Sequence, residues 1–309
     1  MAVQFVKFVG LSALLFAALS DPASARRHHK QSAAQATPET IAPKILPKDA
    51  IAVSLAQPGD PGTVNLSGLN VNYWDSGKVG QTPLIIYSHS FGGCSTQASF
   101  LTGELAKQGW LVMAPDHSDS ACGKFNGKEK TLSDPALWDE TTFLKRRDEM
   151  RRVYRTLKSD TAWRNRIDWS RVAVMGHSLG GYAALAIVGG QPTWRVDGFA
   201  AVLALAPYCE PLKLKGKLGD IGVPVMVQGG AKDEIANPGQ IGANGCFAQT
   251  GGNATYVEFD KAGHMAWTDA NNTAHGNITI YAKQFFASVF SGEPMKLTRL
   301  AGTSDLQQK

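Results

Sequence analysis

The stretch RVAVMGHSLGGYAALAIVGG, residues 171–190, passes from an apolar run into a helical pattern across a turn of small residues. Its apolar, β-branched first half is typical of a strand buried on both faces. At the junction lie Gly176, Ser178 and Gly180, in the pattern G-x-S-x-G. A serine on such a sharp strand-to-helix turn leaves almost no room for side chains two residues before or after it. The stretch therefore predicts a strand, a strained elbow that presents Ser178, and a helix.

Similar apolar runs recur along the chain and alternate with helical patterns. Buried strands are predicted at 83–90, 110–117, 171–178, 199–207, 223–230 and 254–260, after a hairpin at 63–74. Helices are expected at about 95–108, 140–158, 179–189 and 275–291. This alternation predicts an α/β fold with a mostly parallel central sheet and helices on both faces. In such a fold, functional residues gather at the carboxyl ends of the strands.

Two partners for Ser178 follow in order, each just after a later strand. Asp233 lies in GAKDEIANP and His264 lies in KAGHMAW. A serine hydroxyl is a weak nucleophile at neutral pH, so it needs a general base, here His264, and a carboxylate, here Asp233, to orient and stabilise the imidazole. Glu234 is a rival for the acid and His117 for the base. We predict Ser178, Asp233 and His264 as the catalytic residues.

A second, related pentapeptide, HSFGG, occupies residues 89–93. Its serine, Ser90, fails the elbow pattern because Ser88 stands where the first glycine is required. Acyl transfer passes through a tetrahedral oxyanion, which backbone N–H groups stabilise. The donors expected in this fold are the residue after the nucleophile and a loop after an earlier strand. We therefore predict the N–H groups of Leu179 and Phe91 as the oxyanion hole.

The amino-terminal residues have the pattern of a targeting segment. Residues 1–25 combine a lysine, an apolar run and the small-residue sequence Ala23-Ser24-Ala25, which predicts a signal peptide, with an uncleaved anchor as the alternative. The apolar run is shorter than the ~20 residues of a membrane span. Residues 26–48 read as a flexible leader and 49–309 as one catalytic domain. We expect an exported protein, periplasmic or secreted, with no stable membrane span after cleavage.

Four cysteines in an exported chain suggest two disulfides. Three connectivities are possible. We favour Cys94 with Cys122 and Cys209 with Cys246, because each pair would join two loops at the same edge of a parallel sheet. The spacings differ from those of zinc ligands, so no metal site is expected.

The chain carries 31 Lys and Arg against 26 Asp and Glu, a formal charge of +5. Residues 143–160, FLKRRDEMRRVYRTLKSD, are strongly basic. Their apolar residues recur with helical spacing, which predicts an amphipathic helix whose basic residues lie mostly on the solvent face. No aromatic stacking motif accompanies the charge, so we expect no nucleic-acid partner. The oligomeric state stays open.

From PLIIYSHSFGG through GHSLGG and GGAKDEIANP to AGHMAWTD, the chain resembles the esterase branch of the α/β-hydrolases. It is similar to bacterial relatives of platelet-activating-factor acetylhydrolase and dienelactone hydrolase, and more distantly to cutinase-like polyester hydrolases. The resemblance implies cleavage of carboxylic esters without a cofactor, with the roles given above. In two respects the chain departs from these families. Ser90 follows His89 where relatives usually have glycine, and dienelactone hydrolases proper carry cysteine at the position of Ser178, which argues against the dienelactone reaction.

The expected substrate site is an open cleft. The segments after His117 and after 203–208 are too short for a large helical cap, which leaves room for bulky or polymeric esters. Tyr208 falls where polyester hydrolases have an aromatic wall. The predicted lining residues are Phe91, Tyr208, Trp267 and Trp138, although core packing is an equal alternative for both tryptophans. An acyltransferase or amidase with the same triad, or a non-catalytic binding protein on this scaffold, remain alternative functions.

Overall fold

The computed structural model describes residues 60–122, 134–237, 242 and 244–309. All of them belong to the unit Val53–Lys309. The predicted signal peptide at 1–25 and leader at 26–48 lie outside the described residues.

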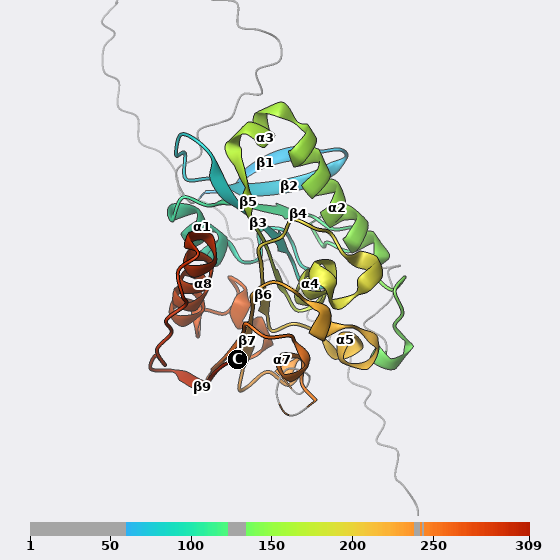
Figure 1. The fold of residues 1–309 in the computed structure, drawn as a ribbon, viewed down its shortest axis with the longest axis vertical. Coiled ribbons are helices and arrows are strands. Elements are labelled where there is room, and N and C mark those ends of the chain that lie inside the picture. The colour runs from blue at the N-terminus through green and yellow to red at the C-terminus, as the bar shows by residue number, and fades with distance from the viewer. Residues whose placement is uncertain (1–59, 123–133, 238–241, 243) are drawn as a thin grey trace, which may run out of the picture. The chain divides into compact units, whose positions relative to one another are not determined.

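The core of this unit is a nine-stranded sheet in the order β1-β2-β4-β3-β5-β6-β7-β8-β9 (Figure 1). The strands are β1 (Gly62–Leu66), β2 (Leu69–Trp74), β3 (Thr82–Ser88), β4 (Leu111–Pro115), β5 (Ile167–His177), β6 (Ala201–Leu205), β7 (Val225–Gly230), β8 (Ala254–Phe259) and β9 (Thr303–Gln308). Strands β3 to β8 pair in parallel, while β1, β2 and β9 are antiparallel additions at the two edges. The predicted mostly parallel sheet and its leading hairpin are confirmed.

Strand β9 was not predicted from the sequence. Its sequence, TSDLQQ, is polar, and most of its side chains are partly or fully exposed. An edge strand of this kind lacks the apolar run that marks the inner strands. It is held by antiparallel pairing with β8, a strand that lies far from it in sequence.

Helices cover both faces of the sheet (Figure 1). Helices α1 (Ser99–Lys107) and α8 (His275–Ser291) lie on one face. Helices α2 (Leu144–Ser159) and α4 (Leu179–Leu185) lie on the other. The remaining helical segments are short: α3 (Thr161–Arg166), α5 (Glu210–Lys215), α7 (Cys246–Gln249), η1 (Pro135–Leu137), η2 (Ala186–Gly190), η3 (Pro192–Trp194), η4 (Leu218–Asp220) and η5 (His264–Trp267).

Two apolar cores, one on each face of the sheet, explain why the sequences of the inner strands are continuous apolar runs. In β3, Leu84 and Ile86 belong to the core beneath α2 and α4, whereas Ile85 and Tyr87 belong to the core beneath α1 and α8. All four side chains are fully buried. Successive strand residues point to opposite faces, so a strand covered on both sides is apolar at every position.

The carboxyl ends of the parallel strands lie side by side, and the predicted functional residues follow them there. Ser178 comes directly after β5, and the HSFGG loop follows β3. Asp233 comes three residues after β7, and His264 comes shortly after β8. Topology therefore brings four separate segments to one place.

The two segments expected to leave the cleft open carry only short helices among the described residues. The segment after β4 holds η1, with residues 123–133 outside the description, and the segment after β6 holds α5 and η4. No helix in the part of the chain that the structure describes is long and apolar enough to cross a bilayer.

Candidate active site

Ser178 lies on a strained elbow between β5 and α4. Its φ of 56° and ψ of −118° are unusual for a residue with a side chain. A Cβ on Gly176 would lie 2.2 Å from the Gly180 carbonyl oxygen, and a Cβ on Gly180 would lie 2.0 Å from the Ser88 carbonyl oxygen. Both distances are far inside van der Waals contact, so the backbone requires glycine at both positions. Gly180 is thus required by close packing against the end of β3, and Gly176 by close packing against the first turn of α4.

The structure brings Ser178, His264 and Asp233 together in a hydrogen-bonded row. The Ser178 Oγ lies 2.9 Å from His264 Nε2. The His264 Nδ1 lies 2.9 Å from Asp233 Oδ2. Because an ionised carboxylate only accepts, His264 donates from Nδ1 and keeps Nε2 to accept the serine proton. This arrangement suits a general base paired with a serine nucleophile.

The carboxylate of Asp233 is held ionised by its surroundings. Burial by itself would raise its pKa, but the hydrogen bond and electrostatic interaction with His264 and the N–H groups of Ala236 and Ile235 outweigh burial and lower the pKa below its ordinary value. Both N–H groups donate to Asp233 Oδ1 at 2.9 Å. The neighbouring Glu234, the rival acid, is an exposed residue, and the row described above runs through Asp233.

His177, next to the serine, holds the backbone of the base. Its Nε2 lies 2.9 Å from the carbonyl oxygen of His264, and its Nδ1 lies 3.1 Å from Gln97 Nε2. Burial and the nearby His264 lower the pKa of His177 to about 3, so its ring stays neutral. The neutral ring therefore donates from Nε2 to the His264 carbonyl and accepts the Gln97 amide at Nδ1.

The HSFGG loop is fixed by its own first residue. His89 is buried, and burial together with the charge of Arg146 lowers its pKa well below 6.5. Its Nδ1 donates to the Ser90 carbonyl oxygen at 2.7 Å, and its Nε2 accepts the His117 N–H at 3.0 Å. Phe91, a predicted oxyanion donor, lines the cleft beside Ser178. Leu179, the other predicted donor, is the first residue of α4, where the N–H has no partner within the helix.

A second Ser–His–acid row lies beneath this loop. His117 Nε2 lies 2.8 Å from Ser88 Oγ, and His117 Nδ1 lies 2.8 Å from Glu149 Oε2. All three residues are buried, with Ser88 at 0 % and His117 at 1 % exposure, so no substrate reaches this serine. Their place under the loop makes the row a structural support. His117, the rival base, therefore bonds Ser88, and His264 is the histidine that bonds Ser178.

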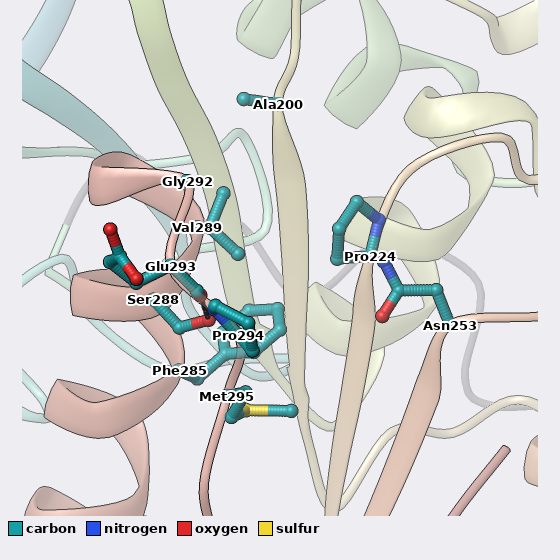
Figure 2. A pocket seen from close by; sticks show the side chains of 10 residues that line it. All are labelled: Ala200, Pro224, Asn253, Phe285, Ser288, Val289, Gly292, Glu293, Pro294 and Met295. Carbon is teal, nitrogen blue, oxygen red and sulfur yellow. Dashed lines mark hydrogen bonds between the residues drawn. The ribbon is translucent and has the colours of Figure 1, made fainter.

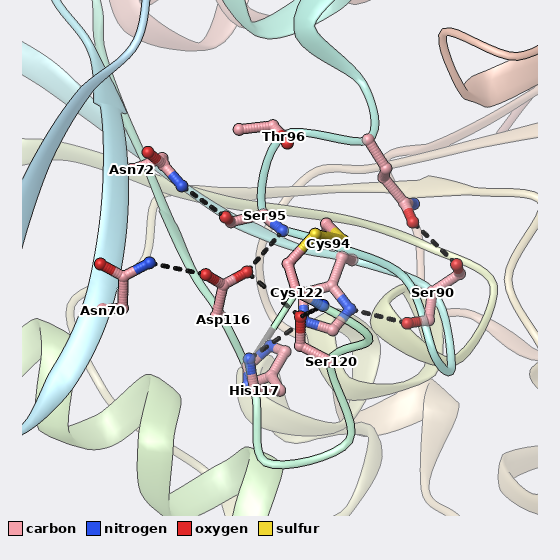
Figure 3. Close-up of a disulfide and its surroundings, with 12 residues drawn as sticks. Asn70, Asn72, Ser90, Cys94, Ser95, Thr96, Asp116, His117, Ser120 and Cys122 are labelled. Carbon is pink, nitrogen blue, oxygen red and sulfur yellow. Dashed lines mark hydrogen bonds between the residues drawn. A yellow bond between two sulfur atoms is a disulfide. The ribbon is translucent and has the colours of Figure 1, made fainter. Parts of the chain in front are cut away.

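Both disulfides join the pairs of cysteines that the sequence favoured. Cys94 is bonded to Cys122, which ties the HSFGG loop to the loop after β4 (Figure 3). Beside this bond, Asp116 accepts the Ser95 N–H at 2.9 Å and the Asn70 amide at 2.7 Å. The second disulfide, between Cys209 and Cys246, ties the start of α5 to α7.

A cleft of about 540 Å³ opens beside Ser178 and His264. Apolar side chains on its rim include Phe91 together with Ile235 and Met265, which are 57 % and 49 % exposed. The sequence did not single out Ile235 or Met265, which follow the acid and the base closely. Their nearness to Asp233 and His264 in sequence was the available signal.

The predicted roles of Trp267 and Trp138 as lining residues were wrong. Trp267 is fully buried, and its indole N–H donates to Gln228 Oε1 at 3.1 Å. Trp138 is 2 % exposed and packs against the ring of Tyr208, with centroids 5.5 Å apart. Both take the core alternative, because large rings gain more from burial than from a wet rim.

Tyr208 is half-buried and is not among the residues that line this cleft. Its N–H donates to the Ser178 carbonyl oxygen at 2.9 Å, so its backbone supports the elbow. The role of its ring as an aromatic wall stays a prediction.

Another hollow, of about 380 Å³, lies at the amino-terminal ends of the parallel strands (Figure 2). Ala200, Pro224 and Asn253 line it just before β6, β7 and β8 begin, and the end of α8 closes it. It is therefore separate from the cleft at Ser178. Among residues 60–122, 134–237, 242 and 244–309, no group of three or more His, Cys, Asp or Glu side chains is arranged to hold a metal ion.

A mostly parallel sheet, a serine on a glycine-flanked elbow, and an acid and a histidine on later strand ends define the α/β-hydrolase fold. Comparison with known families agrees with this fold. Residues 145–288 match a family described as PET hydrolase-like. Residues 71–161 match the family of platelet-activating factor acetylhydrolase, isoform II.

Individual relatives point the same way. Cutinase est2 of Thermobifida alba is 27 % identical over 65 % of this chain and 59 % of its own length. Cutinase est1 of the same organism is 26 % identical over 65 % of this chain and 60 % of its own length. The platelet-activating factor acetylhydrolase of Gallus gallus is 30 % identical over 32 % of this chain and 33 % of its own length. The chain thus resembles α/β-hydrolase esterases of the cutinase and acetylhydrolase kinds, and it spans about three fifths of the length of the two cutinases.

Sequence reasoning missed three residues that surround the site. Gln97 joins His177 to the HSFGG loop. Glu149 and Arg146 lie on the buried face of α2, with Arg146 only 1 % exposed. Arg146 is an exception to the expectation that the basic residues of this helix lie mostly on the solvent face. Its helical spacing with the apolar residue Met150 is the sequence signal that it points inward.

Proposed function

We propose that the protein is a serine hydrolase that cleaves carboxylic esters through an acyl-enzyme on Ser178. The observation that carries this proposal is the row of 2.9 Å contacts from Asp233 through His264 to Ser178, at the rim of an open cleft. The names of the similar proteins, cutinase and platelet-activating factor acetylhydrolase, support ester bonds as the target.

In the first step, His264 Nε2 takes the proton of Ser178 Oγ while the oxygen attacks the ester carbonyl carbon. Asp233 stays ionised and stabilises the imidazolium that forms. The N–H groups of Phe91 and Leu179 are the proposed donors to the oxyanion. His264 then gives its proton to the leaving alcohol oxygen, which completes the acyl-enzyme.

In the second step, water repeats the sequence on the acyl-enzyme. His264 Nε2 takes a proton from the water while its oxygen attacks the acyl carbon. The oxyanion again occupies the hole, and collapse of the intermediate returns the proton from His264 to Ser178 Oγ. The carboxylic acid leaves, and no cofactor takes part in either step.

The cleft favours bulky or polymeric esters as substrates. Its lining is open to solvent, and the exposed apolar side chains of Ile235 and Met265 offer contact area to an apolar acyl or polymer chain. Phe91 adds an aromatic surface to the same cleft.

We also propose that the protein is exported and that residues 1–25 are its signal peptide. The two disulfides support this compartment, because oxidising conditions outside the cytosol preserve such bonds.

Hydrolysis of p-nitrophenyl esters from acetate to palmitate, and of an insoluble polyester film, tests the proposal. We expect turnover that falls about 10⁴- to 10⁶-fold in Ser178→Ala. Equal rates in wild type and Ser178→Ala would overturn the role of Ser178. Turnover confined to short, soluble esters would overturn the preference for bulky substrates.

A further inference from the structure

The buried guanidinium of Arg146 reaches from α2 to the loop that carries Phe91. Arg146 Nη2 donates to the Ser90 carbonyl oxygen at 2.9 Å, and Nη1 donates to the His89 carbonyl oxygen at 2.6 Å. Nη1 also lies 3.2 Å from Ser88 Oγ. One side chain therefore contacts three consecutive residues at the end of β3 and the start of the loop.

The charge of Arg146 is balanced by Asp119, from the loop after β4. Arg146 Nη2 and Nε donate to Asp119 Oδ2 at 2.7 and 3.3 Å, and both residues are 1 % exposed. The planar guanidinium supplies five donors in a fixed arrangement, which a lysine cannot reproduce. The ion pair thus holds the guanidinium plane in one orientation against the loop.

The contact with Ser90 matters because its carbonyl and the N–H of Phe91 belong to the same peptide unit. In a trans peptide the N–H points away from the carbonyl oxygen. The structure contains no cis peptide among its described residues. Fixing the Ser90 carbonyl toward Arg146 therefore turns the Phe91 N–H away from Arg146. Phe91 lines the cleft beside Ser178.

Three N–H donors converge on this one carbonyl oxygen. Besides Arg146, His89 Nδ1 lies 2.7 Å from it and the Gly93 N–H lies 3.1 Å from it. Hydrogen bonds to a carbonyl polarise its amide and strengthen the N–H on the other side. The Phe91 N–H is therefore both oriented and made a better donor.

We propose that Arg146 is a positioning residue of the oxyanion hole, which fixes the Ser90–Phe91 peptide for the tetrahedral intermediate. This inference rests on the proposed esterase function. Oxyanion donors accelerate acyl transfer because they are held in place before charge develops. Loss of the Arg146 contact removes one of the three donors to the Ser90 carbonyl and the only one from another element, so the peptide is held less firmly in the orientation that the reaction needs.

The test compares a p-nitrophenyl ester with its thionoester in wild type and in Arg146→Lys. Charge in the thionoester reaction develops on sulfur, a weak hydrogen-bond acceptor, so that reaction gains little from the hole. We expect kcat for the oxygen ester to fall about tenfold, less than the loss of a whole oxyanion donor would cause, with KM little changed, while kcat for the thionoester falls less than about threefold. Arg147→Lys is the matched control, because Arg147 is on the same helix and pairs with Asp148 away from the loop.

Arg146→Gln combined with Asp119→Asn provides a second variant if the lysine disturbs folding, since it removes both charges of the buried ion pair together. It is expected to show the same selective loss on the oxygen ester. Equal losses of kcat on both esters, or no loss on either, would overturn the role of Arg146 while leaving the esterase function intact. A wild-type protein without activity on either ester would overturn the proposed function, and this inference with it.

Discussion

The hydroxyl of Ser90 and the imidazole of His177 bind the same side chain, that of Gln97. Ser90 Oγ donates to Gln97 Oε1 at 2.8 Å, and Gln97 Nε2 lies 3.1 Å from His177 Nδ1. These two residues belong to the two related pentapeptides of the chain. Since His177 also bonds the backbone of His264, the loop of Phe91 and the loop of the base are connected through one amide.

Ser90→Ala is expected to retain most of the esterase activity. The substitution removes one hydrogen bond to Gln97 at a half-buried position, where water can replace it. Such a bond is worth about 1 kcal/mol, so kcat should fall by no more than about fivefold. Steady-state rates measured beside Ser178→Ala check this. A loss in Ser90→Ala as large as that in Ser178→Ala would show that the two serines have been assigned the wrong roles.

Mild reductant is expected to open Cys94–Cys122 before Cys209–Cys246. Cys122 is exposed, whereas Cys209 and Cys246 are 1 % and 0 % exposed. Opening the first bond frees the HSFGG loop, so kcat should fall about tenfold, a fraction of the loss caused by removing a whole oxyanion donor. Rates should be followed together with thiol labelling by mass spectrometry and near-UV circular dichroism.

A matched pair of variants separates this effect from stability. Cys94→Ser with Cys122→Ser, and Cys209→Ser with Cys246→Ser, should each lose about 3 kcal/mol of unfolding free energy. Only the first pair should lose turnover in the folded state. Equal turnover in both pairs would argue against coupling between the first disulfide and the site.

The free energy of unfolding is expected to decrease as the pH falls below about 6.5. Burial lowers the pKa of His177 to about 3 and the pKa values of His89 and His117 well below 6.5. In the unfolded chain these rings titrate near 6.5, so the unfolded state binds more protons at low pH. Each ring should then contribute about 1.4 kcal/mol per pH unit as the pH falls from 6.5 toward its folded pKa.

Urea unfolding at pH 7, 6 and 5 measures this slope. His177→Gln should reduce it by about one proton, because one of the three buried rings is gone. An unfolding free energy that is constant between pH 7 and pH 5 would contradict the assignment of neutral, buried histidines.

Much of the fold and the row of Ser178, His264 and Asp233 followed from local patterns. The buried strands are apolar at every position because both faces of the sheet are covered, and this can be recognised in a short window. The place of the site followed from topology, since parallel strands end at one edge. The polar edge strand β9 has no such pattern and was missed.

The sequence by itself determined the α/β class, the elbow at Ser178 and the order of its partners, because strand periodicity and elbow sterics are local properties of the chain. Only the tertiary structure decided which residues Arg146 and Glu149 contact, that His117 supports Ser88, and that Trp138 and Trp267 are buried in the core. Arg146 contacts residues 56 to 58 positions away from it. Contacts at that separation depend on how whole elements pack, so helical spacing can indicate that Arg146 faces inward but not which residues it contacts.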